Sequence, residues 1–474
     1  MAASRSPSAR LPGASSVTAV NRTAVFWILT GALLMMSIDT TIVATALHAL
    51  QDGLHTTVNW AAWTITAYLF GYVLMLSVTG KLGERYGSRR VFLVSVAVFT
   101  AASLGCGLVD SIYALIPLRA LQAMGGAAFT PLSTAIAVEH FGDARDRAVS
   151  LFGSFFPIGA MIGPIFGGLF VEYWSWRGVF FVNVPVGVLV FALAWRYIPR
   201  DTRHTPHTPH RRSAMDPLGM LYLGVGLLGV MLAAGALGEN GLRPWSAVLD
   251  LPLLAAFAGF SLFARHVRRV RRPFIPPRLI WGRGFGVVNF INGLYTGGSY
   301  GSVALIPLYA ANRYHVGALD AGTLLTAEGV AVIGTSIACA FALRRTGYRL
   351  PMVVGNAVVI VGMLLLALTP RAGLTPYLWL ALAAFVVGVG YGVTNPASRN
   401  AGLQLAPRHA AAIAALRSMC LQIGSILTIS IGTAVVAASA HPGTAQAWFY
   451  ALLGVLFVFA LPVIRRVPDH RGSW

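Results

Sequence analysis

Charged side chains are what this sequence lacks most. They make up 11% of its 474 residues, whereas a typical soluble domain has about 25%, and Lys81 is the one lysine. Hydrophobic residues account for 56% of the chain, so its polar side chains are too few to cover a surface that faces water on all sides. These proportions exclude an ordinary soluble globular protein and favour a protein that lies in a lipid bilayer.

Cysteine is scarce as well. Cys106, Cys339 and Cys420 each lie in an apolar run without metal-ligand spacing, so neither a disulfide framework nor a cysteine metal site is predicted. The sequence has no phosphate-binding Walker loop, which argues against ATP as the driving force. It also lacks the His/Asp or Cys/His groupings that an enzyme would need within the apolar runs, so the chain is not predicted to be an enzyme.

Long apolar runs are what the chain has instead. A membrane-spanning helix needs about 20 mostly apolar residues. Fourteen such runs lie near residues 23–49, 60–80, 91–109, 112–138, 148–171, 178–197, 217–236, 247–264, 285–310, 319–342, 351–369, 376–397, 409–437 and 446–464. Peptide groups in hydrocarbon must be bonded within one helix or in a closed barrel, and these runs are too long for barrel strands. The predicted fold is therefore an all-α membrane protein with fourteen spans.

The basic residues test this map independently, because cytoplasmic loops of membrane proteins carry an excess of Lys and Arg. Of the 35 such residues, 29 fall in the gaps on the side of the N-terminus and four in the gaps on the other side. Arg119 and Arg417 fall inside spans. We therefore predict a multi-pass protein of the cell inner or plasma membrane, with both termini in the cytoplasm.

The net charge of +20 has a second interpretation, which is nucleic-acid binding. Nucleic-acid-binding domains gather their basic residues on one face of a soluble domain, whereas here these residues are spread over short gaps between apolar runs. No nucleic-acid partner is therefore expected.

The spans form two groups of six around a central pair. The predicted parts are a disordered cytoplasmic tail (1–22), an N-terminal six-helix bundle (23–197), a region of cytoplasmic linkers and two inserted spans (198–284, with spans 217–236 and 247–264), a C-terminal six-helix bundle (285–464) and a cytoplasmic tail (465–474). Transporters are often built from two such halves, with a substrate site between them near the membrane midplane.

The first linker carries His204, His207 and His210 at three-residue spacing. Histidine clusters can bind zinc, but the Thr-Pro pairs between these residues favour an extended polar linker, and no metal site is predicted. A second basic stretch, residues 265–284, is expected to lie against anionic lipid headgroups.

Residues 80–90, with the sequence GKLGERYGSRR, join the second and third spans. They resemble the loop at the same place in the major facilitator superfamily, although Glu84 stands where that family usually has Asp. The resemblance implies a gate loop whose ion pairs latch the two halves on the cytoplasmic side, and the alternative is an ordinary basic loop. The residues of this gate loop are Gly80, Glu84, Arg85, Gly87, Arg89 and Arg90.

Arg119 begins a second match, in the fourth span. Residues 119–126, RALQAMGG, resemble the family's Arg-x-x-Gln-Gly-x-Gly element, with Ala123 in place of the first Gly. An arginine at the centre of a spanning helix costs at least about 2.5–3.5 kcal/mol to insert, so Arg119 is expected to face a cavity or a partner, or else to snorkel toward the outer surface. In related antiporters this arginine is linked to proton transfer, and the resemblance implies that role for Arg119.

The fifth span has a glycine pattern. Gly159, Gly163 and Gly167 recur every four residues, so they share one helix face and allow close packing against a neighbouring helix. Pro164 removes one backbone hydrogen bond and can bend the helix. Together with Gly168 these residues resemble the Gly-Pro-x-x-Gly-Gly signature of the antiport branch, which implies a hinge helix.

Two further stretches, IDTTIV at 38–43 and WRGVFFVNVPVG at 176–187, resemble the fourteen-span drug:proton antiporter branch of the same superfamily. The two inserted spans agree with that branch. The resemblance therefore implies a major-facilitator-like fold of two six-helix bundles plus two extra central transmembrane helices, and a multidrug efflux permease.

Asp39 and Glu328 both lie well inside predicted spans, one in each bundle. Ionisable residues in membrane spans are rare and usually line ion or substrate paths. We predict that Asp39 is a proton or cation site, that Glu328 lines the same cavity, and that both couple protons to substrate together with Arg119. The alternative is that each carboxyl group is a structural hydrogen-bonding group.

The predicted function is a proton-coupled antiporter that exports hydrophobic or cationic small molecules by alternating access. It is expected to need no cofactor, since the proton gradient drives it. The expected partners are the small-molecule substrate, protons and the lipid bilayer, and the protein is expected to be a monomer or part of a larger efflux assembly. The alternatives are a dedicated exporter of one metabolite (an amino acid, sugar, lipid or siderophore) and, from a different class, a membrane receptor or membrane-embedded enzyme.

Overall fold

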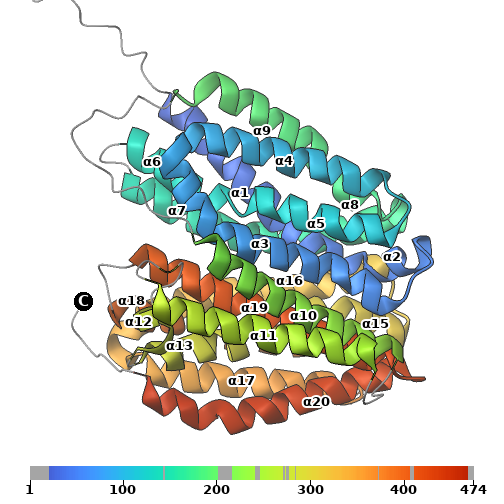
Figure 1. Ribbon diagram of the computed structural model, residues 1–474. Coiled ribbons are helices and arrows are strands. Elements are labelled where there is room, and N and C mark those ends of the chain that lie inside the picture. Colours follow the sequence, from blue (N-terminus) through green and yellow to red (C-terminus); the bar gives the residue numbers. More distant parts are fainter. Residues whose placement is uncertain are drawn as a thin grey trace, which may run out of the picture.

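The computed structural model describes residues 21–141, 145–200, 216–240, 246–270, 273, 277–282, 284–371, 373–405 and 410–467. Within these ranges all regular secondary structure is helical. The helices lie side by side with similar axial directions, and Figure 1 shows those of the N-terminal part above those of the C-terminal part. The predicted all-α architecture is confirmed for the described residues.

The N-terminal half contains nine helical segments in the described ranges. They are α1 (Arg22–Thr45), α2 (Leu47–Gly53), α3 (Val58–Tyr86), α4 (Ser88–Leu108), α5 (Ile112–Gly126), α6 (Phe129–His140), α7 (Arg145–Tyr173), α8 (Gly178–Phe181) and α9 (Asn183–Tyr197). Gly87, with φ 92°, makes the sharp turn between α3 and α4, a backbone conformation that glycine adopts at little cost.

The insert and the C-terminal half follow. The insert consists of α10 (Pro217–Asn240) and α11 (Ala247–Arg269). The segments after it are α12 (Pro277–Trp281), α13 (Phe285–Ile291), η2 (Asn292–Gly297), α14 (Gly298–Ala304), α15 (Ile306–Tyr314), α16 (Ala318–Thr346), α17 (Arg349–Ala367), α18 (Pro376–Leu405), α19 (Ala410–Ala437), α20 (Pro442–Ala460) and η4 (Leu461–Arg466). The last span thus runs on into a short 3-10 helix to Arg466, two residues beyond its predicted end.

Eleven helical segments of the described chain are long and apolar enough to cross a membrane. They include both helices of the insert, which qualify as Pro217–Ala234 and Ala247–Arg269. The predicted spans 60–80, 148–171 and 285–310 have no counterpart among the eleven, although α3, α7 and the α13–α15 segment run through them. Eleven candidate spans, rather than fourteen, are therefore established by length and composition.

Four predicted continuous spans are interrupted, and the first of them, 23–49, breaks at Ala46 between α1 and α2. The span 112–138 breaks between α5 and α6, directly after Gly125 and Gly126, and the span 178–197 breaks at Val182. In the span 285–310, residues 292–297 form a wider π-helical turn, a feature that is rare and often found at functional sites. Close backbone contact accompanies this turn, because a Cβ at Gly297 would lie 2.9 Å from the Gly424 Cα of α19.

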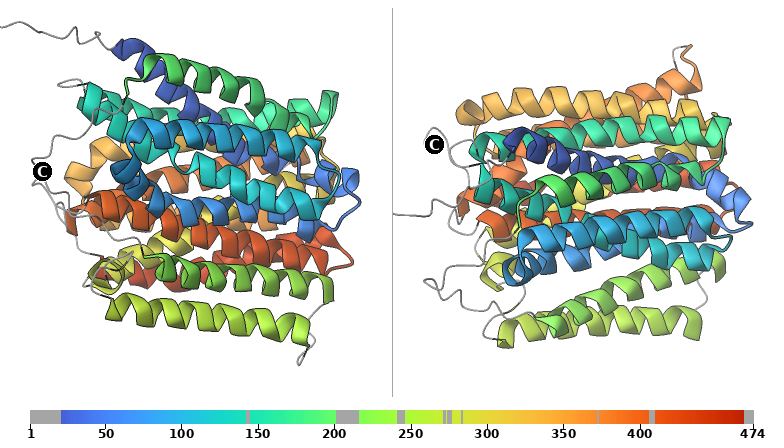
Figure 2. Two further views of the ribbon diagram at one scale, coloured as in Figure 1. Left: turned by 45° about the horizontal axis from the view of Figure 1, so that its top comes forward. Right: turned by 90° about the horizontal axis from the view of Figure 1, so that it is seen from above.

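The two halves meet along two pairs of helices. On one side α7 packs against α16, and on the other α3 packs against α19. Helix α10 contacts both α3 and α19, so the insert covers this second seam, whereas α11 packs mainly on α10. Figure 2 shows the α10–α11 pair at the edge of the molecule in both views. Gly229 permits the close α10–α11 contact, since a Cβ there would lie 2.5 Å from the Ala256 nitrogen.

Several predicted features lie outside the described residues. They are nearly all of the tail 1–22, the last seven residues of the tail 465–474, and the histidines His204, His207 and His210. Among the residues that are described, no group of three or more His, Cys, Asp or Glu side chains could hold a metal ion.

Candidate functional site

A small cavity lies between the two halves. Its volume is about 70 Å³, whereas pockets for drug-sized ligands measure about 300–1,000 Å³, so the cavity is too small for such a molecule in this arrangement of the halves. Helices of both halves supply its wall, which consists of Thr40, Thr41 and Ala44 of α1, Ile65 and Leu69 of α3, Ala160 and Pro164 of α7, Tyr300, Val303 and Ala304 of α14, Leu325 and Glu328 of α16, and Ile429 of α19.

Glu328 is the charged residue among those that line this cavity. It is half-buried on α16, and Tyr300 lines the same cavity. Among the described residues, no hydrogen bond or ion pair holds its carboxyl group. A carboxyl group placed in this way can bind a proton or a cation from the cavity without first giving up a protein partner.

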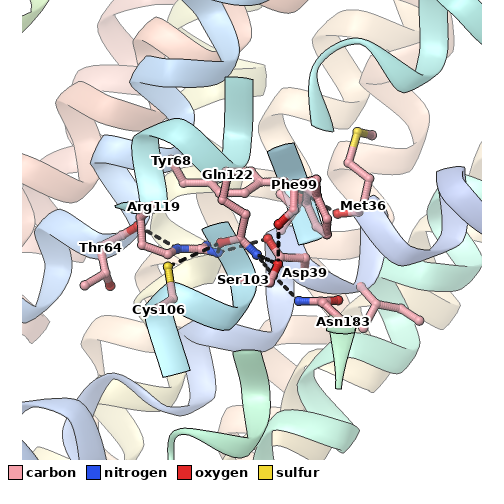
Figure 3. A network of polar contacts seen from close by, with 12 residues as sticks. Met36, Asp39, Thr64, Tyr68, Phe99, Ser103, Cys106, Arg119, Gln122 and Asn183 are labelled. Carbon is pink, nitrogen blue, oxygen red and sulfur yellow. Dashed lines mark hydrogen bonds and ion pairs between the residues drawn. The ribbon is translucent and has the colours of Figure 1, made fainter. Parts of the chain in front are cut away.

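Asp39 is held quite differently (Figure 3). Its side chain is fully buried on α1, and three N–H groups donate to it: Arg119 Nη1 to Oδ2 at 2.9 Å, and Gln122 Nε2 and Asn183 Nδ2 to Oδ1 at 2.9 and 2.7 Å. These donors come from α5 and α9. Each oxygen of the Asp39 carboxyl group therefore accepts at least one hydrogen bond.

Arg119 is the other half of this ion pair. Its side chain is 1% exposed, so it does not snorkel to the surface. Besides Asp39 it donates to the Thr64 carbonyl oxygen (3.2 Å) and to Gln122 Oε1 (2.5 Å), and its guanidinium carbon lies 4.3 Å from the centre of the Tyr68 ring. A buried pair with this many partners is costly to break, because removing either member leaves an uncompensated charge.

The polar network extends through Gln122 to α4. Gln122 Nε2 also donates to Ser103 Oγ at 2.7 Å, and Ser103 Oγ donates to the Phe99 carbonyl oxygen at 2.7 Å. Thus five helices of the N-terminal half, α1, α3, α4, α5 and α9, contribute groups to one connected network (Figure 3). Such networks specify a unique packing when every member is satisfied.

The network and the cavity lie on different sides of α1. Asp39 belongs to the network and is not among the residues that line the cavity, whereas the next two residues, Thr40 and Thr41, line it. Successive residues of a helix point about 100° apart, which explains the separation. The structure therefore brings Asp39 together with Arg119 but does not bring Asp39 together with Glu328. Movement of α1 would act on both the network and the cavity wall.

The predicted hinge helix, α7, lies between α1 and the C-terminal half. Its glycine face packs on α1: a Cβ at Gly159 would lie 2.7 Å from Ser37 Cβ, and one at Gly163 would lie 2.8 Å from the Ile38 carbonyl oxygen. Gly167 faces Ile42 and Thr45 in the same way. Gly168 faces α16 instead, where a Cβ would lie 2.7 Å from Leu319 Cα, and Pro164 lines the cavity.

The predicted gate loop falls on the end of α3 and the start of α4. Gly80 and Glu84 lie in α3, and the Glu84 side chain is outside the described part. Arg89 donates from Nη2 to the Trp195 carbonyl oxygen of α9 at 2.6 Å, while Arg85 and Arg90 are exposed. The contact described for Arg89 is within the N-terminal half, so a latch between the halves stays a prediction.

Sequence reasoning did not single out Gln122 and Asn183 as site residues. Both stand inside the motifs that led to the family resemblance, and an amide within an apolar span was the available signal. Sequence reasoning also did not select Arg417 of α19, whose side chain donates a hydrogen bond to the Asn395 side chain of α18. The Nε atom of Arg417 is buried without a hydrogen-bond partner in the described part of the chain.

Comparisons with known proteins agree with this architecture. A family model described as Major Facilitator Superfamily matches residues 29–429 and 288–473. The multidrug resistance protein B homolog of Mycobacterium tuberculosis is 30% identical over 417 residues, which cover 85% of this chain and 74% of the relative. Multidrug resistance protein 3 of Bacillus subtilis is 28% identical, with coverage of 84% and 76%. The methylenomycin A resistance protein of Streptomyces coelicolor is 28% identical, with coverage of 84% and 82%.

Solved structures give the same fold. The D-xylose-proton symporter superposes with a TM-score of 0.66 at 13% sequence identity, covering 95% of this chain and 99% of that one. An auto-inhibited POT family peptide transporter superposes with a TM-score of 0.63 at 15% identity, covering 92% and 96%. At such low identity the likeness concerns the fold alone.

Proposed function

This chain belongs to the Major Facilitator Superfamily, and from that premise we propose that it exports hydrophobic or cationic small molecules in exchange for protons. The observation that carries the proposal is a buried Asp39–Arg119 pair directly beside the part of α1 that lines a cavity containing Glu328. The relatives support the choice of substrate class, because two are named for multidrug resistance and one for resistance to methylenomycin A.

The proposed mechanism assigns separate roles to the two carboxyl groups. Glu328 lines the cavity and contacts a cationic substrate there. Asp39 receives a proton, and protonation weakens its bonds to Arg119, Gln122 and Asn183, because a neutral carboxyl group attracts these donors less. Release of α1 then moves Thr40 and Thr41 in the cavity wall. Proton and substrate thereby favour different states of the same helix, which is the requirement for coupling.

The finer topology is part of this proposal. It comprises fourteen spans, two bundles of six with α10 and α11 as the central pair, both termini in the cytoplasm, and insertion in the inner or plasma membrane. We assign no cofactor, since the proton gradient supplies the energy, and we assign a monomer as the transporting unit. The charge asymmetry of 29 to four across alternate gaps supports the orientation.

A dedicated exporter of one compound is the second candidate. It is favoured by the methylenomycin A resistance relatives from Streptomyces coelicolor and Bacillus subtilis, whose names specify a single compound. Cavity shape decides between the two candidates, and the closed cavity of about 70 Å³ fits neither kind of substrate until the halves part.

The test uses the purified full chain in liposomes with an imposed pH gradient. A panel of cationic dyes, neutral hydrophobic compounds and single metabolites is added, and the gradient is followed with an internal pH indicator. Several chemically different compounds should collapse the gradient, and protein-free liposomes serve as the control. Collapse by one compound alone would favour the dedicated exporter, and no collapse by any compound would count against proton-coupled export of these classes.

A further inference from the structure

Helix α11 is the most exposed candidate span in the described chain, since 11% of its apolar window is buried against protein. Leu251, Leu254 and Phe257 are 68%, 64% and 75% exposed. They lie at spacings of three and are part of an apolar surface that faces away from α10. In a membrane this surface contacts lipid acyl chains.

The apolar surface ends in a group of arginines. Arg265, Arg268 and Arg269, together with Ser261 and Ala264, line an open hollow of about 410 Å³. Residues at spacings of three and four share one helix face, so the three guanidinium groups are neighbours. All three arginine side chains are exposed. Like charges so placed repel one another, and a bound anion would remove that repulsion.

The opposite face of the same turn is fixed to α10. His266 Nε2 lies 2.7 Å from Asp216 Oδ1, and Asp216 Oδ1 also accepts a hydrogen bond from the Gly219 nitrogen at 2.9 Å. Val267 is 1% exposed. These contacts set the rotation of α11 about its axis, so that the arginines face outward.

No acidic side chain of the insert's described part is available to neutralise the arginines. Asp216 is engaged on the other face. Asp250, the acidic residue of α11 itself, lies fifteen residues from Arg265, or roughly 22 Å along a helix with a rise of 1.5 Å per residue. The cluster therefore has no partner of opposite charge among the described side chains of the insert and lies at the end of a lipid-facing surface.

We propose that Ser261, Arg265, Arg268 and Arg269 bind the phosphate headgroup of an anionic phospholipid whose acyl chains lie along the exposed apolar face of α11. Guanidinium groups form paired hydrogen bonds with phosphate oxygens, and the Ser261 hydroxyl supplies another donor. A lipid fits better than a free phosphate ion because the exposed Leu254 and Phe257 lie about two turns and about one turn before Ser261 on the same helix face. The lipid would hold the insert at the seam between the halves.

Native mass spectrometry of the full chain in neutral detergent tests this proposal. Phosphatidylglycerol and phosphatidylcholine with identical acyl chains are offered in equal amounts. The wild-type chain should retain phosphatidylglycerol at least about tenfold better, and the triple variant Arg265→Gln, Arg268→Gln, Arg269→Gln should lose that preference, since each basic residue near an anionic lipid contributes roughly a fivefold preference. The matching triple change to Lys should keep most of it.

The control is the double variant Arg465→Gln, Arg466→Gln, which removes two exposed basic residues at the end of η4 and should leave the preference unchanged. The proposal is overturned if the triple Gln variant keeps the wild-type preference, if the control loses as much, or if millimolar inorganic phosphate displaces the lipid. Should the triple variant fail to fold, the three single Gln variants are compared, and each should lower the preference.

Discussion

Each half of the molecule has one arginine and one carboxyl group well inside its predicted spans, and the two halves arrange them differently. In the N-terminal half Arg119 and Asp39 form a buried pair, 2.9 Å apart, with amide groups around it. In the C-terminal half Glu328 lines the cavity, and Arg417 donates to an amide oxygen of Asn395. Among the described residues, neither of these C-terminal groups has a partner of opposite charge.

The difference indicates a division of labour. A compensated pair with satisfied neighbours stabilises one arrangement of helices and opposes any other. The N-terminal half is therefore suited to stabilise one conformation of the transporter and to change conformation when the pair is broken. Glu328 has no protein partner among the described residues and lines the cavity, so it can accept a ligand without breaking a bond first, and the C-terminal half is suited to contact the substrate. Helix α1 connects the two functions, since it carries both Asp39 and the cavity residues Thr40 and Thr41.

The largest effect is expected from Asp39→Asn, which removes the compensating charge from the N-terminal half. Loss of one member of a buried pair costs about 3–5 kcal/mol, so efflux driven by a pH gradient should fall at least about a hundredfold, while the chain still inserts in the membrane. Dye efflux from proteoliposomes measures it. Asp52→Asn, at an exposed aspartate of α2, is the matched control and should keep wild-type efflux. Full efflux by the Asp39→Asn protein would refute this role.

Replacing the buried arginine of each half by Gln tests whether the two halves differ as described. Arg119→Gln leaves Asp39 buried without its counter-charge, so melting temperature and transport rate should both drop, the rate by roughly a hundredfold on the scale of broken buried pairs. Arg417→Gln loses a hydrogen bond to an amide, worth about 1–2 kcal/mol, and no carboxylate is left behind. Its rate should change by about thirtyfold at most. Equal losses in the two variants would remove the distinction between the halves.

A third change addresses the cavity carboxyl group. Glu328→Gln keeps the shape of the side chain and removes its charge, so affinity for cationic substrates should fall by roughly tenfold, the value of a hydrogen bond or contact to a charged group. Neutral substrates should bind as before, and the melting temperature should not move, because no bond to protein is lost. Equilibrium binding of matched cationic and neutral dyes provides the measurement. Asp320→Asn, at an exposed position of α16, is the control.

The smallest effect is expected from packing. Gly163→Ala places a methyl group against the Thr41 side chain and 2.8 Å from the Ile38 carbonyl oxygen, and overpacking of this kind costs about 1–3 kcal/mol. Gly334→Ala on α16 meets nothing within 4 Å and should be neutral or slightly stabilising. Thermal unfolding in detergent compares the two. An unchanged melting temperature for Gly163→Ala would show that the contact between α7 and α1 is looser than described.

Much of the helix order could be predicted from the sequence, because apolar length and the alternation of basic gaps both depend on the membrane rather than on tertiary contacts. The insert is an example: α10 and α11 both qualify as spans. The interruptions after Gly126 and over residues 292–297 could not be predicted, because they depend on contacts with other helices, such as that of Gly297 with Gly424.

The candidate site residues could be selected from the sequence one by one, but their grouping could not. Asp39, Arg119 and Glu328 stand out as ionisable groups within apolar runs. Whether Asp39 and Glu328 share one cavity, however, depends on how α1 is oriented about its own axis. A shift of one residue turns a side chain by about 100°, which is the difference between Asp39 in the network and Thr40 in the cavity wall. Hydropathy does not determine that angle.

The central claim is that substrate and protons exchange across this chain, and coupled transport must work in reverse. Liposomes containing the purified chain are loaded with a substrate identified in the dye panel and diluted into substrate-free, weakly buffered medium without a pH gradient, with the membrane potential clamped. Substrate leaving the liposomes should drive protons inward and acidify the lumen, and the Asp39→Asn chain should produce no pH change. Substrate efflux through the wild-type chain without any change in luminal pH would contradict the account.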